Sequence, residues 1–505
     1  MTTLPNWVAR CAANEPNKLA IRCGSTDWSF AQLYEHAVRL AHDLAAVGVV
    51  QGDRIALLAA NGLPYVVTVH ALTLLDAVLV PLNTRLTDDE IRWQLADVHA
   101  AHLLYDERWA VVAERVCATL PMLSHTLLRD ARFANDAIGE QTNQSNAPTL
   151  HDTLDLDALQ AIIYTSGTTG QPKGTSITYG MQWWNAIGSA LNLGHDPSDR
   201  WLVCLPMFHV GGLTILFRSV IAGVGVVVHE RFDAATINRS IWDDSVTIIS
   251  VVAVMVQRLL DASGDVAYPP TLRCMLLGGG PAPLPLLEAC AARGIPIVQT
   301  YGMTESCSQA VTLAPDAAIR KLGSAGRPLA AVQLRIVHEG TLAIADEVGE
   351  IQLRGPTITL GYIDRPEATA RAFGAEGWFA TGDLGYLDAE GYLYIVDRRT
   401  DLIISGGENV YPAEIEAALL AHPAVAEAGV CGIADAQWGS VPIAFVHLRS
   451  EGETTAEVLR AFLAERLARY KLPHAIHIVG PLPRNSSGKL LRRELLAMLP
   501  HNTLS

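Results

Sequence analysis

A loop rich in glycine and threonine follows a short apolar run near residue 160. Ala161, Ile162 and Ile163 lead directly into the segment 164–174, YTSGTTGQPKG, which ends in a lysine and a glycine. Such a segment presents backbone N–H groups, hydroxyl groups and one ammonium group to a common point, as a polyphosphate requires. The sequence therefore predicts a loop that binds a nucleoside triphosphate.

An ordinary turn is the alternative, because clusters of glycine and threonine are most often solvated loops. The length and order of this cluster favour phosphate binding. The spacing is not that of a P-loop, which needs four residues between its first glycine and a Gly-Lys-Ser/Thr triplet. Gly167, Gly170 and Lys173-Gly174 are spaced differently, and Gly488-Lys489 is followed by Leu490. A kinase or a P-loop ATPase is therefore disfavoured.

The size and composition of the chain predict a large globular protein. Its 505 residues are enough for a multilayer body and a smaller appended domain. Hydrophobic residues make up 50% and charged residues 18%, so buried sheets are expected and extensive disorder is not. The formal net charge of -15 argues against a nucleic acid or an anionic membrane as the main partner.

Cysteine usage and apolar stretches bear on the location of the protein. Eight cysteines are scattered without a CxxC pair, which predicts reduced core thiols rather than metal ligands or disulfides. The N-terminal residues lack the basic start and apolar run of a secretory signal. The apolar stretch 65–82 contains His70, Asp76 and Pro81, so we expect a buried helix that passes into a strand. These features predict a cytoplasmic protein without integral membrane contact.

The first part of the chain alternates helical and strand patterns. Residues 30–47 have helical spacing, 54–60 and 78–81 are short apolar runs, and Thr87 with Glu90 forms a capping box. This alternation predicts a parallel sheet covered by helices. After a polar connection at 131–157, apolar runs that alternate with helical stretches such as 284–292 predict a second doubly wound sheet. Its strands are expected at 201–205, 224–228, 248–252, 274–277 and 295–298.

The pattern changes twice more toward the C-terminus. Short strands and turns fill residues 332–398, which predicts a small antiparallel element. From residue 401 the order becomes strand, helix, two strands, helix and strand, with the helices expected from Pro412 and at 456–467. A compact α+β domain is therefore expected at the end of the chain.

Four further segments carry groups suited to a nucleotide or to catalysis. They are QTYGMTE at 299–305, TGDL at 381–384, DRRTDLIISGG at 397–407 and PRNSSGK at 483–489. Each has an ordinary explanation on its own: Asp383 as a turn cap, Glu305 as a helix start, Arg398 as a surface charge and Lys489 as part of a basic tail. Their joint occurrence favours one shared site.

Together with YTSGTTGQPKG, these segments match in order the signatures of the adenylate-forming acyl-CoA synthetase superfamily, which the chain resembles over nearly its whole length. The resemblance implies an α/β N-terminal domain at 1–397, with two doubly wound sheets and a small β-barrel. It also implies a small mobile α+β C-terminal domain at 398–505 that rotates about a hinge near Thr400. Many members carry Asp or Lys at the place of Thr400, so a pivot at Asp401 is an alternative.

The activity implied by this resemblance is that of an ATP-dependent acid–thiol ligase. A carboxylate attacks the α-phosphorus of MgATP to give acyl-AMP and pyrophosphate, and the thiol of CoA then displaces AMP. The first step brings an anion toward a polyanion, so it needs positive charge and oriented donors more than a strong base. The implied ligands are ATP, Mg²⁺ and CoA, and the substrate is a small-molecule carboxylic acid.

The resemblance also implies a role for each residue of the site. The triphosphate would be held by Thr165, Ser166, Gly167, Thr168, Thr169 and Lys173, and Mg²⁺ by Glu305. Adenine would lie against Tyr301, Gly302 and the backbone of Gly278, Gly279 and Gly280, and the ribose would be held by Asp383 and Arg398. Lys489 would bridge the carboxylate and the α-phosphate, with Thr304 and Glu305 completing the catalytic set. After domain rotation, Ser405, Gly406 and Gly407 would approach the pantetheine tunnel of CoA.

Longer strings, such as DRWLVCLPMFHVGGL and LLGGGPAPLPLLEAC, resemble the branch of the family that ligates 2-succinylbenzoate to CoA in menaquinone biosynthesis. That acid carries a second carboxylate on its ring, which needs a cation or fixed donors among apolar walls. We expect the acid to contact His209, Arg218, Ser306 and Ser308. The alternatives are that His209 gates the tunnel or packs in the core and that Arg218 faces solvent.

Other functions stay open at this point. The chain resembles aryl- and fatty-acid–CoA ligases in the same motifs, and a free-standing adenylation enzyme that serves a carrier protein would share them too. A non-catalytic relative is disfavoured because Lys489 and Glu305 are both present. Whether the chain forms a homo-oligomer is not visible in one sequence.

Overall fold

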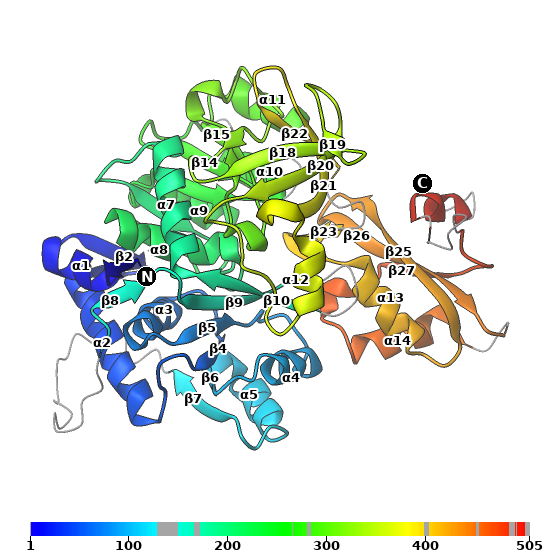
Figure 1. Cartoon of the computed structure of the whole chain (residues 1–505), viewed down its shortest axis with the longest axis horizontal. Coiled ribbons are helices and arrows are strands. Elements are labelled where there is room, and N and C mark those ends of the chain that lie inside the picture. Colours follow the sequence, from blue (N-terminus) through cyan, green and yellow to red (C-terminus); the bar gives the residue numbers. More distant parts are fainter. Residues whose placement is uncertain are drawn as a thin grey trace. The chain divides into compact units, whose positions relative to one another are not determined.

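The computed structural model describes residues 2–128, 150–165, 172–264, 266–279, 284–397, 403–450, 454–483, 490 and 492–499. The chain divides into two compact units, which we call the large unit and the small unit (Figure 1). The large unit comprises Met1–Thr84, Leu95–Ile163 and Gly174–Val396. The small unit comprises Arg85–Gln94, Tyr164–Lys173 and Asp397–Ser505.

The first sheet has six strands in the order β10-β9-β5-β4-β6-β7. The pairs β4/β5, β4/β6, β5/β9 and β6/β7 are parallel, as the alternation of helices and strands predicted. The strand bounds are β4 (Arg54–Leu58), β5 (Val78–Pro81), β6 (His102–Asp106), β7 (Ser124–Leu128), β9 (Leu159–Thr165) and β10 (Lys173–Thr178).

The second sheet has nine strands in the order β17-β16-β15-β14-β13-β11-β12-β2-β3. Its central strands pair in parallel, whereas β3, β16 and β17 at the two edges pair antiparallel. The bounds are β2 (Leu19–Cys23), β3 (Thr26–Ser29), β11 (Arg200–Val203), β12 (Gly225–Val228), β13 (Ile248–Val251), β14 (Cys274–Leu277), β15 (Ile297–Tyr301), β16 (Val311–Thr312) and β17 (Arg327–Pro328).

Alternate residues of the second sheet enter two different apolar cores. Val203 and Val226 join a core that also contains residues of the first sheet. Their neighbours Leu202 and Val227 join a core with the helices α9 (Ala234–Asp243), α10 (Ala253–Ser263) and α11 (Leu284–Ala292). Both faces of the sheet are therefore buried, which explains the nearly continuous apolar runs of its strands. The helices of this region are α1 (Trp7–Asn14), α2 (Phe30–Ala46), α3 (Leu63–Leu75), α4 (Asp88–Asp97), η1 (Glu107–Trp109), α5 (Ala110–Cys117), α7 (Tyr179–Leu193), α8 (Val210–Ala222), α9 (Ala234–Asp243), α10 (Ala253–Ser263), α11 (Leu284–Ala292) and α12 (Pro366–Ala372).

Local signals explain where several helices begin. The N–H of Gln32 donates to the Ser29 hydroxyl over 3.3 Å at the start of α2, and the predicted capping box of Thr87 and Glu90 precedes α4. The apolar stretch at 65–82 is the buried helix α3 followed by the strand β5, as predicted. Among the described helices, none combines the length and the apolar character needed to span a bilayer.

A five-stranded sheet in the order β19-β18-β20-β21-β22 occupies the predicted antiparallel region. It shares an apolar core with the end of the nine-stranded sheet, because Tyr301 and Val311 pack with Ile351 and Phe379. The bounds here are β18 (Gln333–His338), β19 (Thr341–Leu342), β20 (Gly349–Arg354), β21 (Phe379–Leu387) and β22 (Leu393–Asp397). Shorter elements are β1 (Thr3–Pro5), β8 (Thr153–Asp155), η3 (Thr304–Ser306), η4 (Pro315–Ala317) and η5 (Ala375–Gly377).

The small unit has its own sheet, in the order β24-β23-β26-β25 with β27 paired to β26. Helices α13 and α14 pack on this sheet (Figure 1). The bounds are β23 (Ile403–Ser405), β24 (Glu408–Val410), α13 (Pro412–Leu420), β25 (Val425–Asp435), β26 (Gly439–Leu448), α14 (Ala456–Ala464), η6 (Arg469–Lys471), β27 (Ala475–Ile478) and η7 (Arg492–Met498). The predicted α/β fold class is confirmed.

Candidate active site

The predicted adenine contacts lie where parallel strands of the nine-stranded sheet end. Gly278 and Gly279 follow β14, and Tyr301 is the last residue of β15. A Cβ atom on Gly278 would lie 2.9 Å from the Thr300 side chain, and Gly279 has a φ of +79°. Glycine thus allows the close packing against Thr300 at the first position and the left-handed backbone at the second. Ligands of such sheets bind at the carboxyl ends of the strands, so the position suits a nucleotide.

Tyr301 and Asp383, predicted to contact adenine and ribose, are direct neighbours. The Tyr301 hydroxyl donates to the Asp383 carboxylate over 2.7 Å, and both side chains are buried. The N–H of Asp383 donates to the Thr381 hydroxyl over 3.1 Å, and that hydroxyl donates to the Ile351 carbonyl oxygen over 2.7 Å. The strand β21 thus places a carboxylate beside the end of β15.

The loop after β15 is tightly folded around Ser306. The Ser306 hydroxyl accepts from the N–H of Met303 over 2.9 Å and is 3.1 Å from the carbonyl oxygens of Met303 and Ser308. A Cβ atom on Gly302 would lie 1.6 Å from the Ser308 carbonyl oxygen, so no other residue fits there. Cys307 and Ser308 have φ values of 54° and 85°, in the left-handed region. This fold fixes the backbone of Glu305, and it leaves the Ser306 hydroxyl bonded to the protein's own backbone.

Glu305 is a buried carboxylate whose described hydrogen-bond partner is a neutral hydroxyl. Its Oε1 accepts from the Tyr362 hydroxyl over 2.9 Å, and its carbonyl oxygen accepts from the N–H of Thr359 over 2.7 Å. The segment that carries Tyr362 also pairs with β10, because Ile363 donates from its N–H to the Gly174 carbonyl oxygen over 2.8 Å. The structure therefore joins Glu305 to the strand that follows the predicted phosphate loop.

Sequence reasoning did not find Tyr362. A tyrosine in the string GYIDRPEA has no local signature of a site residue. The one available signal was Gly361, which has a φ of +137° and whose Cβ atom would lie 2.4 Å from the Thr369 side chain. That signal marks a forced turn, and it does not identify the partner of the next residue.

The residues around Glu305 fit the predicted Mg²⁺. Within the described ranges, no group of three or more His, Cys, Asp or Glu side chains lies close enough together to hold a metal ion. Mg²⁺ is commonly held by one or two carboxylates together with the phosphates of a nucleotide, so a protein cage is not required. A single buried carboxylate beside a nucleotide site matches that arrangement.

Several predicted residues lie outside the described part of the chain. They are Ser166, Gly167, Thr168, Thr169, Gly280, Arg398, Thr400 and Lys489. The residues next to the phosphate loop are described: Thr165 ends β9, and Lys173 begins β10. The roles of all these residues stay predictions.

Arg218 is buried in α8, so the alternative that it faces solvent is wrong. Its side chain is 3% exposed, its Nη2 donates to the Asn185 Oδ1 over 2.6 Å, and its guanidinium lies 5.1 Å from the centre of the Trp201 ring. Its Nε has no hydrogen-bond partner, and no described Asp or Glu forms an ion pair with it. Burial lowers the pKa of Arg218 to about 10, so the group still carries its charge near neutral pH.

Further polar groups without partners lie on the helices and the loop that hold this arginine. Both polar atoms of the buried Gln309 amide lack a hydrogen-bond partner, as do the hydroxyls of Thr214 and Ser189. Thr214 lies one turn before Arg218 on α8, and Ser189 lies one turn after Asn185 on α7. We call Arg218, Asn185, Gln309, Thr214 and Ser189 the buried polar cluster. Unsatisfied buried polar atoms in such number indicate a place for a polar ligand group or for ordered water.

His209 precedes the same helix. It is half-buried, and its ring packs edge-on against Phe208, with the ring centres 4.7 Å apart. Two residues into α8, Gly212 is packed so closely that a Cβ atom would lie 2.4 Å from the Pro206 carbonyl oxygen. The helix start is thereby held against the loop that carries His209.

The predicted CoA loop is a tight hairpin in the small unit. Ser405 and Glu408 pair across β23 and β24, and the two residues between them, Gly406 and Gly407, have φ values of 58° and 86°. Two positive φ angles are the geometry of a type I′ turn, which explains the glycine pair. A Cβ atom on Gly406 would also lie 2.6 Å from the Trp438 ring.

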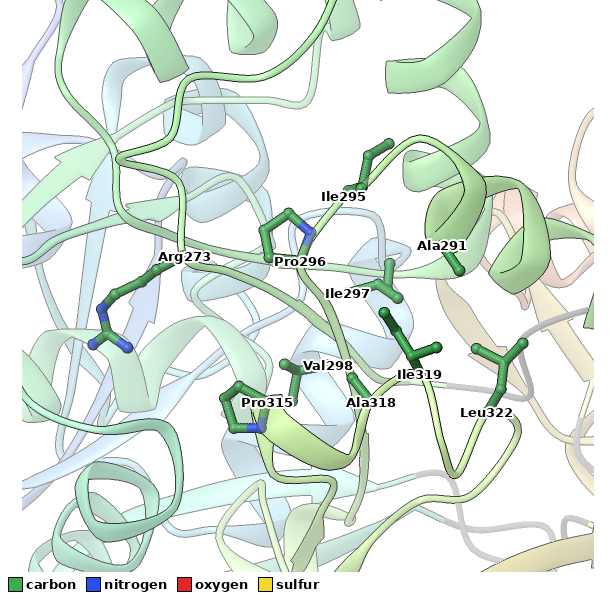
Figure 2. Close-up of a pocket in the computed structure, with 11 residues that line it drawn as sticks. Arg273, Ala291, Ile295, Pro296, Ile297, Val298, Pro315, Ala318, Ile319 and Leu322 are labelled. Atoms are coloured by element: carbon green, nitrogen blue, oxygen red, sulfur yellow. The ribbon is translucent and has the colours of Figure 1, made fainter.

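A pocket of about 150 Å³ lies near the starts of β14 and β15, whereas the predicted nucleotide contacts lie at the ends of these strands. Figure 2 shows the residues that line the pocket. It is bordered by Arg273, which precedes β14, by Ile295, Pro296 and Ile297 at the start of β15, and by Ile319. None of the predicted site residues lines it. Arg273 is engaged in an ion pair with Asp199 at 2.5 Å, so the pocket offers chiefly apolar side chains.

Comparison with known proteins identifies the family. The AMP-binding enzyme family matches residues 8–363, and the AMP-binding enzyme C-terminal domain matches residues 414–489. The 2-succinylbenzoate–CoA ligase of Geobacillus kaustophilus (strain HTA426) is 49% identical over 500 residues, which cover 99% of each chain. The corresponding ligase of Bacillus mycoides (strain KBAB4) is 46% identical over 495 residues, with 98% of each chain covered.

Solved structures give the same answer. The o-succinylbenzoate CoA synthetase of Bacillus subtilis bound to a product analogue has a TM-score of 0.91 and 43% identity, with 98% of each chain covered. The same enzyme with ATP and magnesium ion has a TM-score of 0.73 at 43% identity, over 98% of this chain and 100% of that one. The predicted resemblance is confirmed: the chain belongs to the AMP-binding enzyme family of adenylate-forming ligases.

Proposed function

We propose that this protein is an AMP-forming acid–CoA ligase that converts 2-succinylbenzoate to 2-succinylbenzoyl-CoA, a step of menaquinone biosynthesis, in the cytoplasm. Relatives named as 2-succinylbenzoate–CoA ligases match 98% to 99% of the chain at 46% to 49% identity. The structural observation that carries the choice of acid is Arg218, a buried cation without a described carboxylate partner. An acid with a second carboxylate supplies what this cation lacks.

In the first half-reaction, the succinyl carboxylate attacks the α-phosphorus of ATP and pyrophosphate leaves. Tyr301 and Asp383, joined by their 2.7 Å hydrogen bond, would hold the adenosine, with Arg398 at the ribose. Thr165 to Thr169 and Lys173 would hold the β- and γ-phosphates, and Lys489 would neutralise charge where the two anions meet. Bound Mg²⁺ would neutralise phosphate charge, and Glu305 is the carboxylate that would hold it.

In the second half-reaction, the CoA thiol attacks the acyl carbon and AMP leaves with its electron pair. The hairpin of Ser405, Gly406 and Gly407 would guide the pantetheine arm, since a turn without side chains allows close approach of the ligand to the backbone. Thr304 is in the short helix η3 beside Glu305, where it would contact the reacting phosphate.

The acid pocket is proposed around the buried polar cluster and His209. Arg218 would bind the ring carboxylate, a charge-assisted interaction that is strongest where water is excluded. Ser308 lies on the same loop as Glu305 and would be a further hydrogen-bond donor to the acid. Ser306 is better suited to holding the loop, because its hydroxyl already bonds to the backbone of Met303 and Ser308.

The test is pyrophosphate release with a panel of acids, followed by addition of an acceptor. We expect turnover of 2-succinylbenzoate to exceed that of hexanoate, benzoate and malonate, and CoA to discharge the acyl-AMP. Greater turnover of hexanoate or benzoate would instead support a fatty- or aryl-acid ligase. Discharge of preformed acyl-AMP by a phosphopantetheinylated carrier protein, and not by CoA, would support a free-standing adenylation enzyme.

A further inference from the structure

We infer that Asn185 is a positioning residue, which holds Arg218 in the orientation that receives the ring carboxylate and ties it to the loop that carries Glu305. This inference rests on the proposed function. Asn185 lies on α7, and no sequence motif of the chain includes it.

Asn185 makes two hydrogen bonds that fix its orientation. Its side chain is 1% exposed, its Oδ1 accepts from the Arg218 Nη2 over 2.6 Å, and its Nδ2 donates to the Gln309 carbonyl oxygen over 2.8 Å. A guanidinium only donates and a carbonyl oxygen only accepts, so one orientation of the amide satisfies both. The side chain is thereby locked between α8 and the loop.

The other described contact of the guanidinium, with the Trp201 ring, does not fix its orientation. Trp201 lies beneath Arg218, and its ring is fixed because its Nε1 donates to the Ser250 hydroxyl over 2.9 Å. Attraction to the face of a ring holds a cation near the ring but sets no direction for its N–H groups. The directional bond from Nη2 to Asn185 therefore fixes the orientation of the guanidinium plane, while the Nε is left without a hydrogen-bond partner.

The choice of an amide has a chemical consequence. An aspartate in this place would form an ion pair with Arg218 and compensate its charge within the protein. A neutral amide accepts the same hydrogen bond and leaves the positive charge uncompensated. A substrate carboxylate then meets a cation that is oriented but not neutralised, which favours an acid with two anionic groups over an acid with one.

The second bond of Asn185 links this cation to the catalytic loop. Gln309 is four residues after Glu305, and the backbone between them includes the left-handed residues Cys307 and Ser308. The position of the guanidinium and the end of this loop therefore depend on one side chain. An acid whose ring carboxylate is bound by Arg218 would therefore have a fixed position relative to the loop that carries Glu305.

The experiment compares two acids that differ in one group. These are 2-succinylbenzoate and 4-oxo-4-phenylbutanoate, which lacks the ring carboxylate, and the measured quantity is the ratio of their kcat/KM values in pyrophosphate release. We expect Asn185→Leu to lower this ratio roughly 10-fold, because a hydrogen bond to a charged group is lost. The ratio does not depend on the fraction of enzyme that is folded.

A double-mutant cycle separates positioning from general structure. In an Arg218→Met background, Asn185→Leu should change the ratio less than about 2-fold, because there is no guanidinium left to orient. The matched control is Gln182→Leu on the same helix, whose buried amide donates to Gln160 over 3.1 Å, and it should leave the ratio unchanged. If Asn185→Leu does not fold, Asn185→Ser is measured in the same cycle and should lower the ratio in the same direction.

The outcomes distinguish the inference from the function on which it rests. Failure of the unmodified enzyme to use 2-succinylbenzoate would overturn the proposed function. If that enzyme uses 2-succinylbenzoate, an equal drop of the ratio with and without Arg218, or no drop in either background, would overturn the role of Asn185 alone.

Discussion

Two cationic side chains of the described chain are buried, Lys471 in the small unit and Arg218 in the large unit, and their surroundings differ. The ammonium of Lys471 lies 2.7 Å from a Glu414 oxygen and 2.6 Å from a Glu90 oxygen. The guanidinium of Arg218 has an amide oxygen and an aromatic ring in place of carboxylates. Both side chains are 3% to 4% exposed, so burial alone does not explain the difference.

The two surroundings indicate two roles. Burying a charge without a partner costs several kcal/mol, which a fold tolerates when a ligand later supplies the opposite charge. Lys471 is compensated by the protein itself and is therefore structural. No described carboxylate pairs with Arg218, so under the proposed function a bound anion would compensate its charge. Glu305, a buried carboxylate that accepts from the Tyr362 hydroxyl, is its counterpart of opposite sign.

The largest effect is expected from removing the ammonium of Lys471, which pairs with two carboxylates. Lys471→Met should lower the stability of the small unit by about 3–5 kcal/mol, because Glu414 and Glu90 would lose their cation. Hydrogen exchange of peptides that cover α13 and η6 measures this loss. As a control, Arg320→Met removes an exposed ion pair with Glu390 and should have a much smaller effect on stability. Equal effects of the two variants would show that burial of Lys471 has no energetic consequence.

The matching change at Arg218 should leave stability nearly untouched. We expect Arg218→Met to change the free energy of unfolding by less than about 1 kcal/mol, because the gain from not burying a charge offsets the unpaired Asn185 oxygen. Urea unfolding followed by tryptophan fluorescence measures it. A loss as large as that of Lys471→Met would mean that the protein, rather than a ligand, compensates this cation.

Glu305, the buried carboxylate, can be tested in the same way. Tyr362→Phe removes the hydroxyl that donates to Glu305, and we expect adenylation to slow roughly 10-fold and to need more Mg²⁺. A titration of pyrophosphate release with Mg²⁺ measures both quantities. Tyr34→Phe, a tyrosine of α2 outside the site, serves as the control. An unchanged Mg²⁺ dependence would argue that Tyr362 does not act through Glu305.

The smallest effect is expected from pH: KM for 2-succinylbenzoate should hardly change with it. The lowered pKa of Arg218, about 10, still lies above the neutral range, so its charge should be constant between about pH 7 and pH 9. KM for 2-succinylbenzoate should therefore stay constant over that range. A KM that rises with pH within that range would contradict this prediction.

The sequence predicted the positions of helices and strands better than it predicted which strands pair with one another. The predicted helix at 284–292 is α11 residue for residue, and the expected strands at 78–81 and 274–277 are β5 and β14. The sequence did not predict which strands share a sheet. The strands β2 and β3 join the nine-stranded sheet, although they precede β4 of the six-stranded sheet in the chain. Strand pairing depends on contacts between distant residues, and local patterns do not contain that information.

The same distinction applies to the site. The motifs predicted Tyr301 and Asp383 for one nucleotide, and the structure joins them by a hydrogen bond. Tyr362 and Asn185 escaped notice because each is a single polar residue whose side chain bonds to residues that are distant in the sequence. Arg218 could be chosen from its segment, but only the three-dimensional structure shows that no described carboxylate pairs with it.

The most direct test of this account is the selectivity of the unmodified enzyme and of Arg218→Met for 2-succinylbenzoate over 4-oxo-4-phenylbutanoate in pyrophosphate release. If Arg218 binds the ring carboxylate, the unmodified enzyme should prefer the dianionic acid by roughly 100-fold, and the variant should lose most of that preference. An unmodified enzyme that uses both acids equally well, or a variant that keeps the full preference, would contradict it.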